Sequence, residues 1–220
     1  MKQAIVIGGT SSLGLELANQ LAGTYEVIVT GSGKHKPEGL DVRTCDLSGG
    51  AELGPNIVGL VEGLPEVELV VYAAGYGQMG TITDLTPEDI GHMACVGLVA
   101  PVLLVRELLL KQGKILQFVA ITSTSAFTPR LKEPVYTAVK AGLSMFAHSL
   151  SMDERVGKTL VVAPGGMRTP FWDGMDVDTS GFLEPAQVAK ITLENLTGNY
   201  RYKLIKIPRD TGIFEVVEAA

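Results

Sequence analysis

The sequence predicts an α/β fold, a single domain built on a doubly wound parallel sheet. Short apolar runs of strand length recur along the chain, and they are continuous rather than alternating. This pattern is typical of strands buried on both faces. Segments with helical spacing lie between the runs, and such alternation favours a parallel sheet. We therefore expect ligands to bind beyond the carboxyl ends of the strands.

The expected elements follow one another in regular order. The predicted strands are Ala4–Ile7, Val27–Thr30, Leu69–Ala73, Ile115–Ile121, Leu160–Ala163 and Leu204–Ile207. The predicted helices are Gly14–Ala22, Thr86–Gln112, Glu133–Met152 and Glu184–Leu196. The second and fourth helices have a proline just inside the cap, where its missing N–H costs nothing.

Composition excludes several classes of protein. The chain has 220 residues, of which 46% are apolar and 19% charged, so it is not intrinsically disordered. A net charge of −6 without a basic block argues against a nucleic-acid binder. Cys45 and Cys95 lie far apart and the histidines are scattered, so we expect no metal site and a reducing, cytoplasmic environment. No signal peptide or membrane-spanning run is expected.

A glycine-rich turn follows the first predicted strand and leads into a helix. It reads Gly8-Gly9-Thr10-Ser11-Ser12-Leu13-Gly14. Glycines let the backbone approach a ligand, and the helix N-terminus offers free N–H groups to a pyrophosphate. The turn therefore indicates a Rossmann-type dinucleotide site, although a tight turn without a ligand is the alternative.

The second strand indicates which dinucleotide is preferred. A NAD site usually ends this strand with a carboxylate that holds the ribose 2′-hydroxyl. Residues 31–36, directly after the predicted strand Val27–Thr30, contain no carboxylate. They do contain Ser32, Lys34 and Lys36. These side chains suit a 2′-phosphate, so we expect NADP(H) to be preferred over NAD(H). The alternative is that the lysines belong to a solvated surface loop.

Tyr136 and Lys140 lie four residues apart in the third predicted helix and so share one face. A nearby ammonium favours phenolate, which lets a tyrosine exchange a proton with a carbonyl or alcohol oxygen. The strand before this helix ends in hydroxyl residues that include Ser123. An ordinary amphipathic helix face is the alternative.

These motifs occur in the order and spacing of the short-chain dehydrogenase/reductase family, which the sequence resembles over nearly its whole length. The family's glycine motif matches Gly8, Ser12 and Gly14, with serine at the middle glycine and Ile7 in place of threonine. Tyr72-Ala73-Ala74-Gly75 matches its N-N-A-G segment without the asparagines. The implied cofactor residues are Gly8, Thr10, Ser11, Ser12, Leu13, Gly14, Ser32, Lys34, Asp46, Leu47, Ala73, Ala74, Gly75, Tyr136, Lys140, Pro164, Gly165 and Thr169.

The resemblance also implies catalytic roles. Tyr136 would be the general acid or base, Lys140 would hold the nicotinamide ribose and lower the tyrosine pKa, and Ser123 would bind the substrate oxygen. The expected activity is hydride transfer between NADP(H) and a carbonyl or secondary alcohol in a small molecule. The alternative is a catalytically silent NADP(H)-binding sensor or scaffold protein.

One departure from the family concerns the helix after the fourth strand. Gly97 stands where the family has an asparagine that supports a water in a proton relay. Pro101 has no N–H, so in an α-helix the Gly97 carbonyl would lack its donor. We expect this carbonyl to take over the relay, which makes Gly97 a candidate catalytic position. A plain kink at Pro101 is the alternative.

The substrate end of the site is expected in the remaining loops. Tyr76, Phe127 and Trp172 are candidate substrate contacts, and a short lid is expected at about residues 170–183. Arg130, Lys132 and Arg168 either attract an anionic substrate or are solvated surface charges. The helices around Leu98–Leu110 and Leu143–Leu150 are apolar on more faces than one domain covers. This predicts a homodimer or homotetramer.

Overall fold

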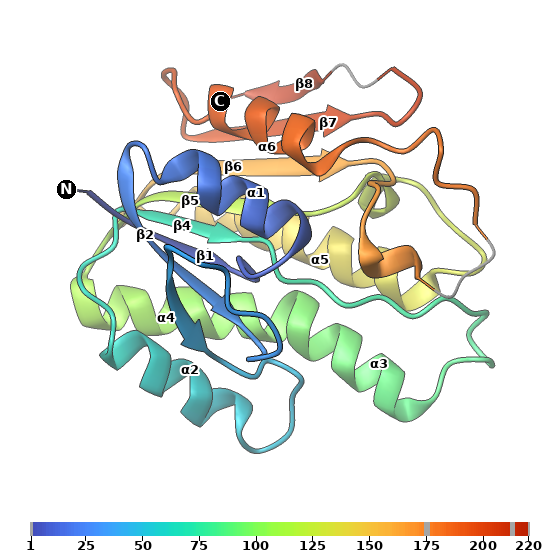
Figure 1. Cartoon of the computed structure of the whole chain (residues 1–220), viewed down its shortest axis with the longest axis horizontal. Helices are drawn as coiled ribbons and strands as arrows, with labels where there is room; N and C mark the ends of the chain where they lie inside the picture. Colours follow the sequence, from blue (N-terminus) through green and yellow to red (C-terminus); the bar gives the residue numbers. More distant parts are fainter. Residues whose placement is uncertain (1, 174–176, 212–213, 220) are drawn as a thin grey trace.

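A computed structural model describes residues 2–173, 177–211 and 214–219. Within these residues an eight-stranded sheet forms the centre of the molecule (Figure 1), in the order β3-β2-β1-β4-β5-β6-β7-β8. Neighbouring strands are parallel except β7 and β8, which are antiparallel. The predicted doubly wound α/β fold is therefore confirmed, with one antiparallel edge strand added.

Each of the six predicted apolar runs forms a strand, and two further strands occupy the edges. The bounds are β1 Lys2–Ile7, β2 Tyr25–Gly31, β3 Asp41–Thr44, β4 Leu69–Tyr72, β5 Ile115–Ile121, β6 Val156–Pro164, β7 Tyr202–Ile207 and β8 Glu215–Ala219. The apolar pattern missed β3 because this edge strand is mostly exposed and polar in sequence. The apolar pattern also missed β8, which is an edge strand as well and pairs only with β7.

The four predicted helices are present with small shifts at their ends. The helices are α1 Ser12–Leu21, α2 Leu53–Glu62, α3 Pro87–Ala94, α4 Ala100–Gln112, α5 Pro134–Leu150 and α6 Pro185–Glu194. Shorter turns are η1 Cys95–Val99, η2 Thr124–Phe127 and η3 Pro170–Trp172. The helix α2 was not predicted from the sequence, because Gly54, Pro55 and Gly59 obscure its helical pattern.

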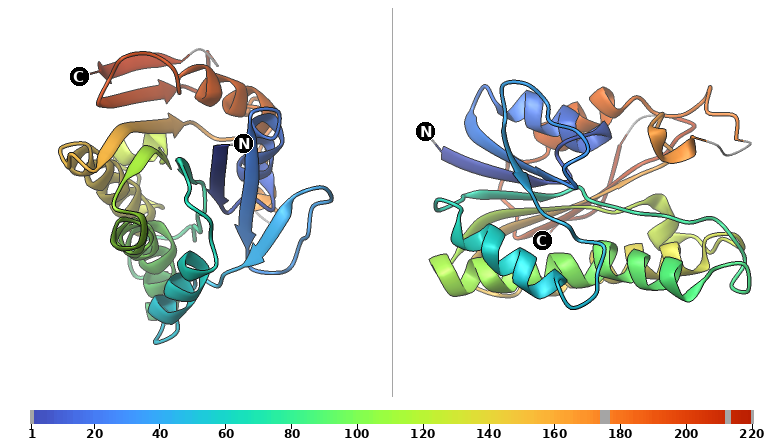
Figure 2. Two further views of the ribbon diagram at one scale, coloured as in Figure 1. Left: turned by 90° about the vertical axis from the view of Figure 1, so that its left-hand side faces the viewer. Right: turned by 60° about the horizontal axis from the view of Figure 1, so that its bottom comes forward.

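The helices cover both faces of the sheet (Figure 2). On one face α1 and α6 pack side by side, and on the other lie α2, α4 and α5. Consecutive residues of β1 point to opposite faces, as in any strand. Ile5 and Ile7 join the core beneath α2, α4 and α5, whereas Ala4 and Val6 join the core beneath α1 and α6. Both faces of the central strands are thus buried, as their continuous apolar runs predicted.

The long helix Pro87–Gln112 has a π-helical turn in its middle. Residues Cys95–Val99 form η1, so α3, η1 and α4 are one helix of 26 residues. By length and apolar composition this helix could cross a membrane, although its continuous apolar run in the sequence is too short for a span. Leu104 and Leu108 are buried in the core of the domain. A core helix of a soluble protein passes the same test, so the finding is weak evidence for a membrane span.

Candidate active site

A cavity of about 870 Å³ lies at the carboxyl ends of the parallel strands. The loops after β1, β2, β4, β5 and β6 all contribute to its lining, as does the start of α5. All the residues that the family resemblance implied for the cofactor line this one cavity. Its position is the one where doubly wound folds bind ligands.

The first loop and the loop after β4 lie in direct contact at Gly8. This residue has a φ of +80°, a conformation that favours glycine. A Cβ placed on Gly8 would lie 2.7 Å from the Cα of Ala74, far inside contact distance. The resulting cradle has bare backbone at the N-terminus of α1, where a phosphate is bound well. The residues present therefore fit a dinucleotide.

Ser12, at the family's middle glycine position, keeps a glycine-like backbone. It is the first residue of α1 and has a φ of +48°, the only described non-glycine residue with a positive φ. A side chain in this region is strained by about 1–2 kcal/mol. The serine thus replaces the glycine in sequence while the turn retains the shape that glycine would give it.

Replacing Ser12 with glycine should relieve this strain. We expect Ser12→Gly to raise the free energy of unfolding by about 1 kcal/mol, measured by urea denaturation. Ser11→Gly is the matched control, because Ser11 has an extended φ of −156° that needs no glycine. Equal effects of the two changes would show that the backbone of Ser12 is not strained.

The cavity is also lined by residues predicted to contact the adenosine part of the cofactor. Ser32 and Lys34 follow β2, are exposed and line the cavity, whereas Lys36 is absent from its lining. Asp46 also lines it and accepts a hydrogen bond from the Ser48 backbone N–H at 2.9 Å. Hydrogen bonds from Ser48 hold the pKa of Asp46 below its usual value, so its side chain stays an acceptor.

Lys140 is a buried cation that lines the cavity. Only 5% of the residue is exposed, and its Nζ donates to the Ile121 carbonyl at 3.1 Å. The same atom lies 5.7 Å from the centre of the Tyr136 ring. Burial disfavours the charged form and lowers the pKa of Lys140 to about 8. The ammonium is therefore still mostly charged at neutral pH.

Tyr136 lies one helical turn before Lys140 and lines the same cavity. Burial raises the pKa of its phenol to about 12. A hydrogen bond with the Ser123 side chain acts in the opposite direction, and the charge of Glu133 raises the pKa further. The phenol is therefore protonated at neutral pH and can serve as a proton donor. The net shift is opposite to the lowering of the tyrosine pKa that the resemblance implied for Lys140, because burial dominates.

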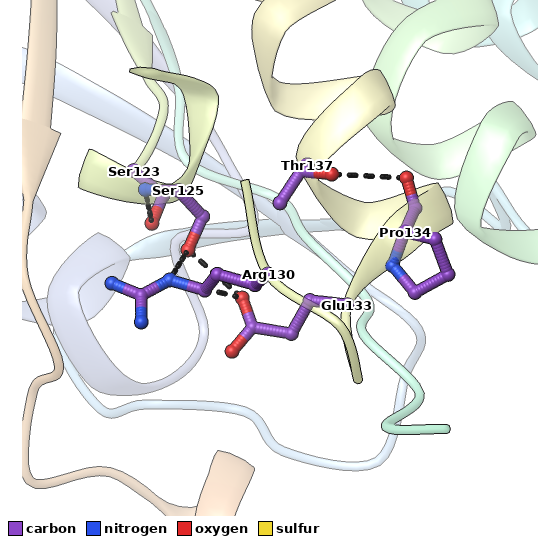
Figure 3. Close-up of polar contacts among 6 residues, drawn as sticks. All are labelled: Ser123, Ser125, Arg130, Glu133, Pro134 and Thr137. Carbon is purple, nitrogen blue, oxygen red and sulfur yellow. Dashed lines mark hydrogen bonds and ion pairs between the residues drawn. The ribbon is translucent and has the colours of Figure 1, made fainter. Parts of the chain in front are cut away.

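Ser123 caps the short helix η2 that follows β5. Its Oγ accepts a hydrogen bond from the Ser125 backbone N–H at 3.1 Å (Figure 3). A hydroxyl that accepts in this way can still donate its own hydrogen. The predicted catalytic side chains Ser123, Tyr136 and Lys140 are thus brought together in the cavity.

Gly97 lies outside the lining of this cavity as far as the structure describes it. A Cβ on Gly97 would lie 2.2 Å from Cγ1 of Val139, so α5 fills the space where a side chain would stand. In the π-helical turn an N–H bonds to the carbonyl five residues earlier, and Ala100 N donates to Cys95 O in this way. Pro101 consequently fails to provide a donor for the Val96 carbonyl.

The phenol of Tyr72 compensates for this missing donor. Tyr72 is fully buried at the end of β4 and donates a hydrogen bond to the Val96 carbonyl. Tyr72 occupies the first asparagine position of the family's N-N-A-G segment. The π-helical turn before Pro101 thus has its free carbonyl bound by a side chain from the sheet. The carbonyl that Pro101 leaves without a helical donor is that of Val96 and not, as predicted, that of Gly97. The relay through the Gly97 carbonyl stays a prediction.

Two of the three residues predicted to contact the substrate line the cavity. Tyr76 and Trp172 line it, and Tyr76 stacks on His92 with their ring centres 4.1 Å apart. Phe127 is absent from the described lining, and its ring lies under Nζ of Lys206 at 4.3 Å. The sequence showed that Phe127 follows Ser123 closely, but it did not show that η2 turns the chain between them.

Several lining residues were missed or given little weight on the basis of sequence. They are His92, Ser125, Arg130, Glu133, Phe182 and Arg209. The sequence showed only that a second serine follows β5 and that charged residues lie nearby. Which of these side chains form hydrogen bonds with one another depends on the three-dimensional fold. Among the described residues no group of three or more His, Cys, Asp and Glu is placed to hold a metal ion.

An aromatic cluster covers the substrate end. Phe171 lies 6.2 Å from the Tyr136 ring, and Trp172 packs edge to face on both Phe171 and Phe182. The indole N–H of Trp172 donates to the Met167 carbonyl at 3.0 Å, which fixes the ring. These residues belong to the expected lid at 170–183, of which residues 174–176 lie outside the described part.

Comparison with known proteins identifies the family and the fold. The short chain dehydrogenase family profile matches residues 2–178. A putative ketoacyl reductase of Streptomyces coelicolor is 30% identical, over 76% of this chain and 71% of its own. A solved short-chain dehydrogenase/reductase of Vibrio parahaemolyticus is 26% identical with a TM-score of 0.77, covering 94% of this chain and 97% of that one.

A third comparison concerns a structure that contains a cofactor. A variant of actinorhodin polyketide ketoreductase, solved with NADPH, has a TM-score of 0.76 over 96% of this chain and 97% of its own. Its 21% identity shows a shared fold only. The family profile spans most of the chain, and the side chains for which the resemblance implied catalytic roles line one cavity. The chain belongs to the short-chain dehydrogenase/reductase family of oxidoreductases.

Proposed function

We propose that the chain is an NADP(H)-dependent oxidoreductase that interconverts a carbonyl compound and a secondary alcohol. The observation that carries this proposal is the convergence of Ser123, Tyr136 and Lys140 on the cavity that also contains the phosphate-binding turn. When bound, the nicotinamide supplies or accepts the hydride. The residues of the chain bind the substrate oxygen and move the proton.

Each of these residues has a distinct task in carbonyl reduction. Tyr136 gives its phenolic proton to the carbonyl oxygen as negative charge develops there. Ser123 donates a second hydrogen bond to the same oxygen, and the Ser125 N–H that bonds to its Oγ holds the hydroxyl in place. Lys140 stabilises the tyrosinate that remains. Its ammonium is buried, and the attraction between the two opposite charges is stronger where water is excluded.

The preference for NADP(H) is the next part of the proposal. Ser32 and Lys34 line the cavity at the end of β2, and no carboxylate lies between residues 30 and 36. The NADPH found with the actinorhodin ketoreductase agrees with this preference. The same edge of the NAD-binding sites in this fold has an acidic residue that would repel a 2′-phosphate.

Thermal shifts with the two reduced cofactors test this preference. We expect NADPH to raise Tm more than NADH at equal concentration, because a tighter ligand stabilises more. Lys34→Ala should weaken NADPH binding about tenfold and leave NADH binding unchanged. Lys36→Ala is the matched control, since this lysine of the same loop does not line the cavity. A larger shift with NADH would contradict the preference.

A substrate panel separates the enzyme from the sensor or scaffold. Aldehydes, ketones and quinones are offered with NADPH, and loss of absorbance at the nicotinamide band is followed. Gly97, Ser12 and the replaced asparagines favour a silent protein, whereas the glycine-like backbone of Ser12 and the presence of Ser123, Tyr136 and Lys140 in one cavity favour the enzyme. Silence toward all three classes, with NADPH binding intact, would favour the sensor.

We also propose that the chain is one soluble, cytoplasmic domain with a lid at 170–183 and that it forms a homodimer or homotetramer. Much of the apolar surface expected on α4 is buried within the domain itself, including Leu104 and Leu108. Val99, Val102 and Met145 remain exposed on the long helix and α5. These residues support a smaller contact face than the sequence suggested. Light scattering of the purified protein would measure whether a homodimer or a homotetramer forms.

A further inference from the structure

A small polar cluster joins the two elements that carry the catalytic hydroxyls. It consists of Ser125 in η2, Glu133 immediately before α5, and Arg130 in the loop between them (Figure 3). All three residues line the cavity. Ser125 lies two residues after Ser123, and Glu133 lies three residues before Tyr136. The cluster is thus placed to control how these two side chains face each other.

The hydroxyl of Ser125 is held from two sides. Its Oγ donates to Oε2 of Glu133 at 2.8 Å and accepts from Nε of Arg130 at 3.0 Å. Nε of Arg130 lies 3.7 Å from the same carboxylate oxygen. Ser125 is 6% exposed, so water competes little for these bonds. Because both partners are charged, the bonds are stronger than those between neutral groups.

The backbone of the same residue holds the catalytic serine. The Ser125 N–H donates to Oγ of Ser123 at 3.1 Å, and the Ala126 N–H donates to the Ser123 carbonyl at 2.9 Å. A fixed Ser125 therefore fixes the direction of the Ser123 side chain. At the other end, the Glu133 carbonyl accepts from the Thr137 N–H at 2.9 Å within the first turn of α5.

We propose that Ser125 and Glu133 are positioning residues of this active site, which hold Ser123 and Tyr136 in the relation that proton transfer requires. These roles rest on the carbonyl reduction proposed above. Neither residue is needed as a proton donor, because Ser123 and Tyr136 supply both hydrogen bonds to the substrate oxygen. Their effect is expected in the rate of the chemical step and not in cofactor binding.

Glu133 also acts on Tyr136 through its charge. A carboxylate near a phenol disfavours tyrosinate, and the pKa of Tyr136 is raised in part for this reason. The proton is thereby kept on Tyr136 until the substrate oxygen takes it. The titratable or charged groups around Tyr136 are Glu133 and Lys140 of its own helix, Arg130 of the preceding loop, Tyr76 after β4, and Asp89 and His92 of α3 behind Tyr76.

The charge effect is tested by a spectroscopic titration that needs no turnover. Tyrosinate absorbance in the near ultraviolet is followed with rising pH, and the matching Tyr136→Phe protein is subtracted to isolate one phenol. Glu133→Gln keeps an acceptor for Ser125 but removes the charge, so we expect the pKa of Tyr136 to fall by about half a unit. Glu107→Gln is the control, because Glu107 also pairs with an arginine but does not line the cavity.

The positioning role is tested by kinetics. Ser125→Ala should lower kcat about tenfold and leave the Kd of NADPH within about twofold, because only the catalytic geometry is disturbed. Ser149→Ala, an exposed serine of α5, is the control and should match the wild type. Unchanged kcat in Ser125→Ala, or an unchanged Tyr136 pKa in Glu133→Gln, would overturn the proposal.

The two measurements also separate this proposal from the proposed function. If the wild-type protein reduces no carbonyl compound, the proposed function fails, and the titration of Glu133→Gln still decides whether Glu133 acts on Tyr136. If Ser125→Ala does not fold, the pH dependence of kcat in Glu133→Gln decides instead. Its basic limb should then move to lower pH, and an unmoved limb would overturn the proposal.

Discussion

Tyr136→Phe is expected to reduce kcat about 10³-fold, because general acid catalysis typically contributes about 10²–10⁴-fold. The change removes one hydroxyl and leaves the ring, which packs near Phe171 and lies close to Nζ of Lys140. The cavity therefore keeps its shape. We expect the Kd of NADPH, measured by fluorescence, to stay within about twofold of the wild type, since one hydroxyl remote from the phosphates contributes little.

Tyr25→Phe is the matched control for this change. Tyr25 also lies partly buried, in β2, but it does not line the cavity. This variant should keep the wild-type kcat for the best substrate of the panel. Turnover by Tyr136→Phe at the wild-type rate would contradict the catalytic assignment. Loss of NADPH binding in the same protein would show instead that the change had damaged the site.

Lys140→Met is expected to stabilise the protein while abolishing its activity. Burial lowers the pKa of Lys140 from 10.5 to about 8, so keeping this group charged at neutral pH costs about 3 kcal/mol. Methionine has a similar length and no charge. It forfeits the hydrogen bond to the Ile121 carbonyl, so we expect a net gain of about 2 kcal/mol in unfolding free energy at pH 7.

The gain should depend on pH in a defined direction. Between about pH 8 and 10.5 the unfolded chain holds a proton on Lys140 that the folded chain has released. The unfolded state then binds more protons, and the contribution of Lys140 to wild-type stability rises with pH. The advantage of Lys140→Met is therefore full below pH 8 and disappears above about pH 10.5.

Denaturant unfolding at pH 7 and at pH 10 measures this difference. Lys190→Met is the control, because Lys190 is exposed on α6 and its replacement should change stability by less than about 0.5 kcal/mol. A Lys140→Met protein that is less stable than the wild type at pH 7 would contradict the prediction. It would show that interactions in the folded protein offset the cost of burying the ammonium. The expected trade of stability for activity is common at catalytic sites.

The fold was largely predictable because its central strands bury both faces. Continuous apolar runs such as Leu160–Ala163 are typical of buried parallel strands when helical segments lie between them. The edge strands β3 and β8 lack this signal because only one side of each is paired. The helix α2 escaped prediction because glycine and proline lower helix propensity locally, while Ile57 and Val61 are secured by burial against the sheet.

The site was predictable wherever sequence spacing decides position. Tyr136 and Lys140 share a helix face, and the glycine-rich turn follows a buried strand. Phe127 could not be placed because η2 turns between it and Ser123. The cluster of Ser125, Arg130 and Glu133 depends on how a loop folds back on α5, for which no periodic pattern exists. Loops at functional sites are generally less predictable than the scaffold beneath them.

The close approach of α5 to Gly97 limits how this chain can change over time. A side chain at position 97 would collide with Val139, whose methyl group stands 2.2 Å from the place of a Cβ. An asparagine at 97 would therefore require a smaller or displaced side chain at 139. Helix packing alone is a sufficient reason for a glycine at this position, so the missing asparagine does not by itself indicate a loss of activity.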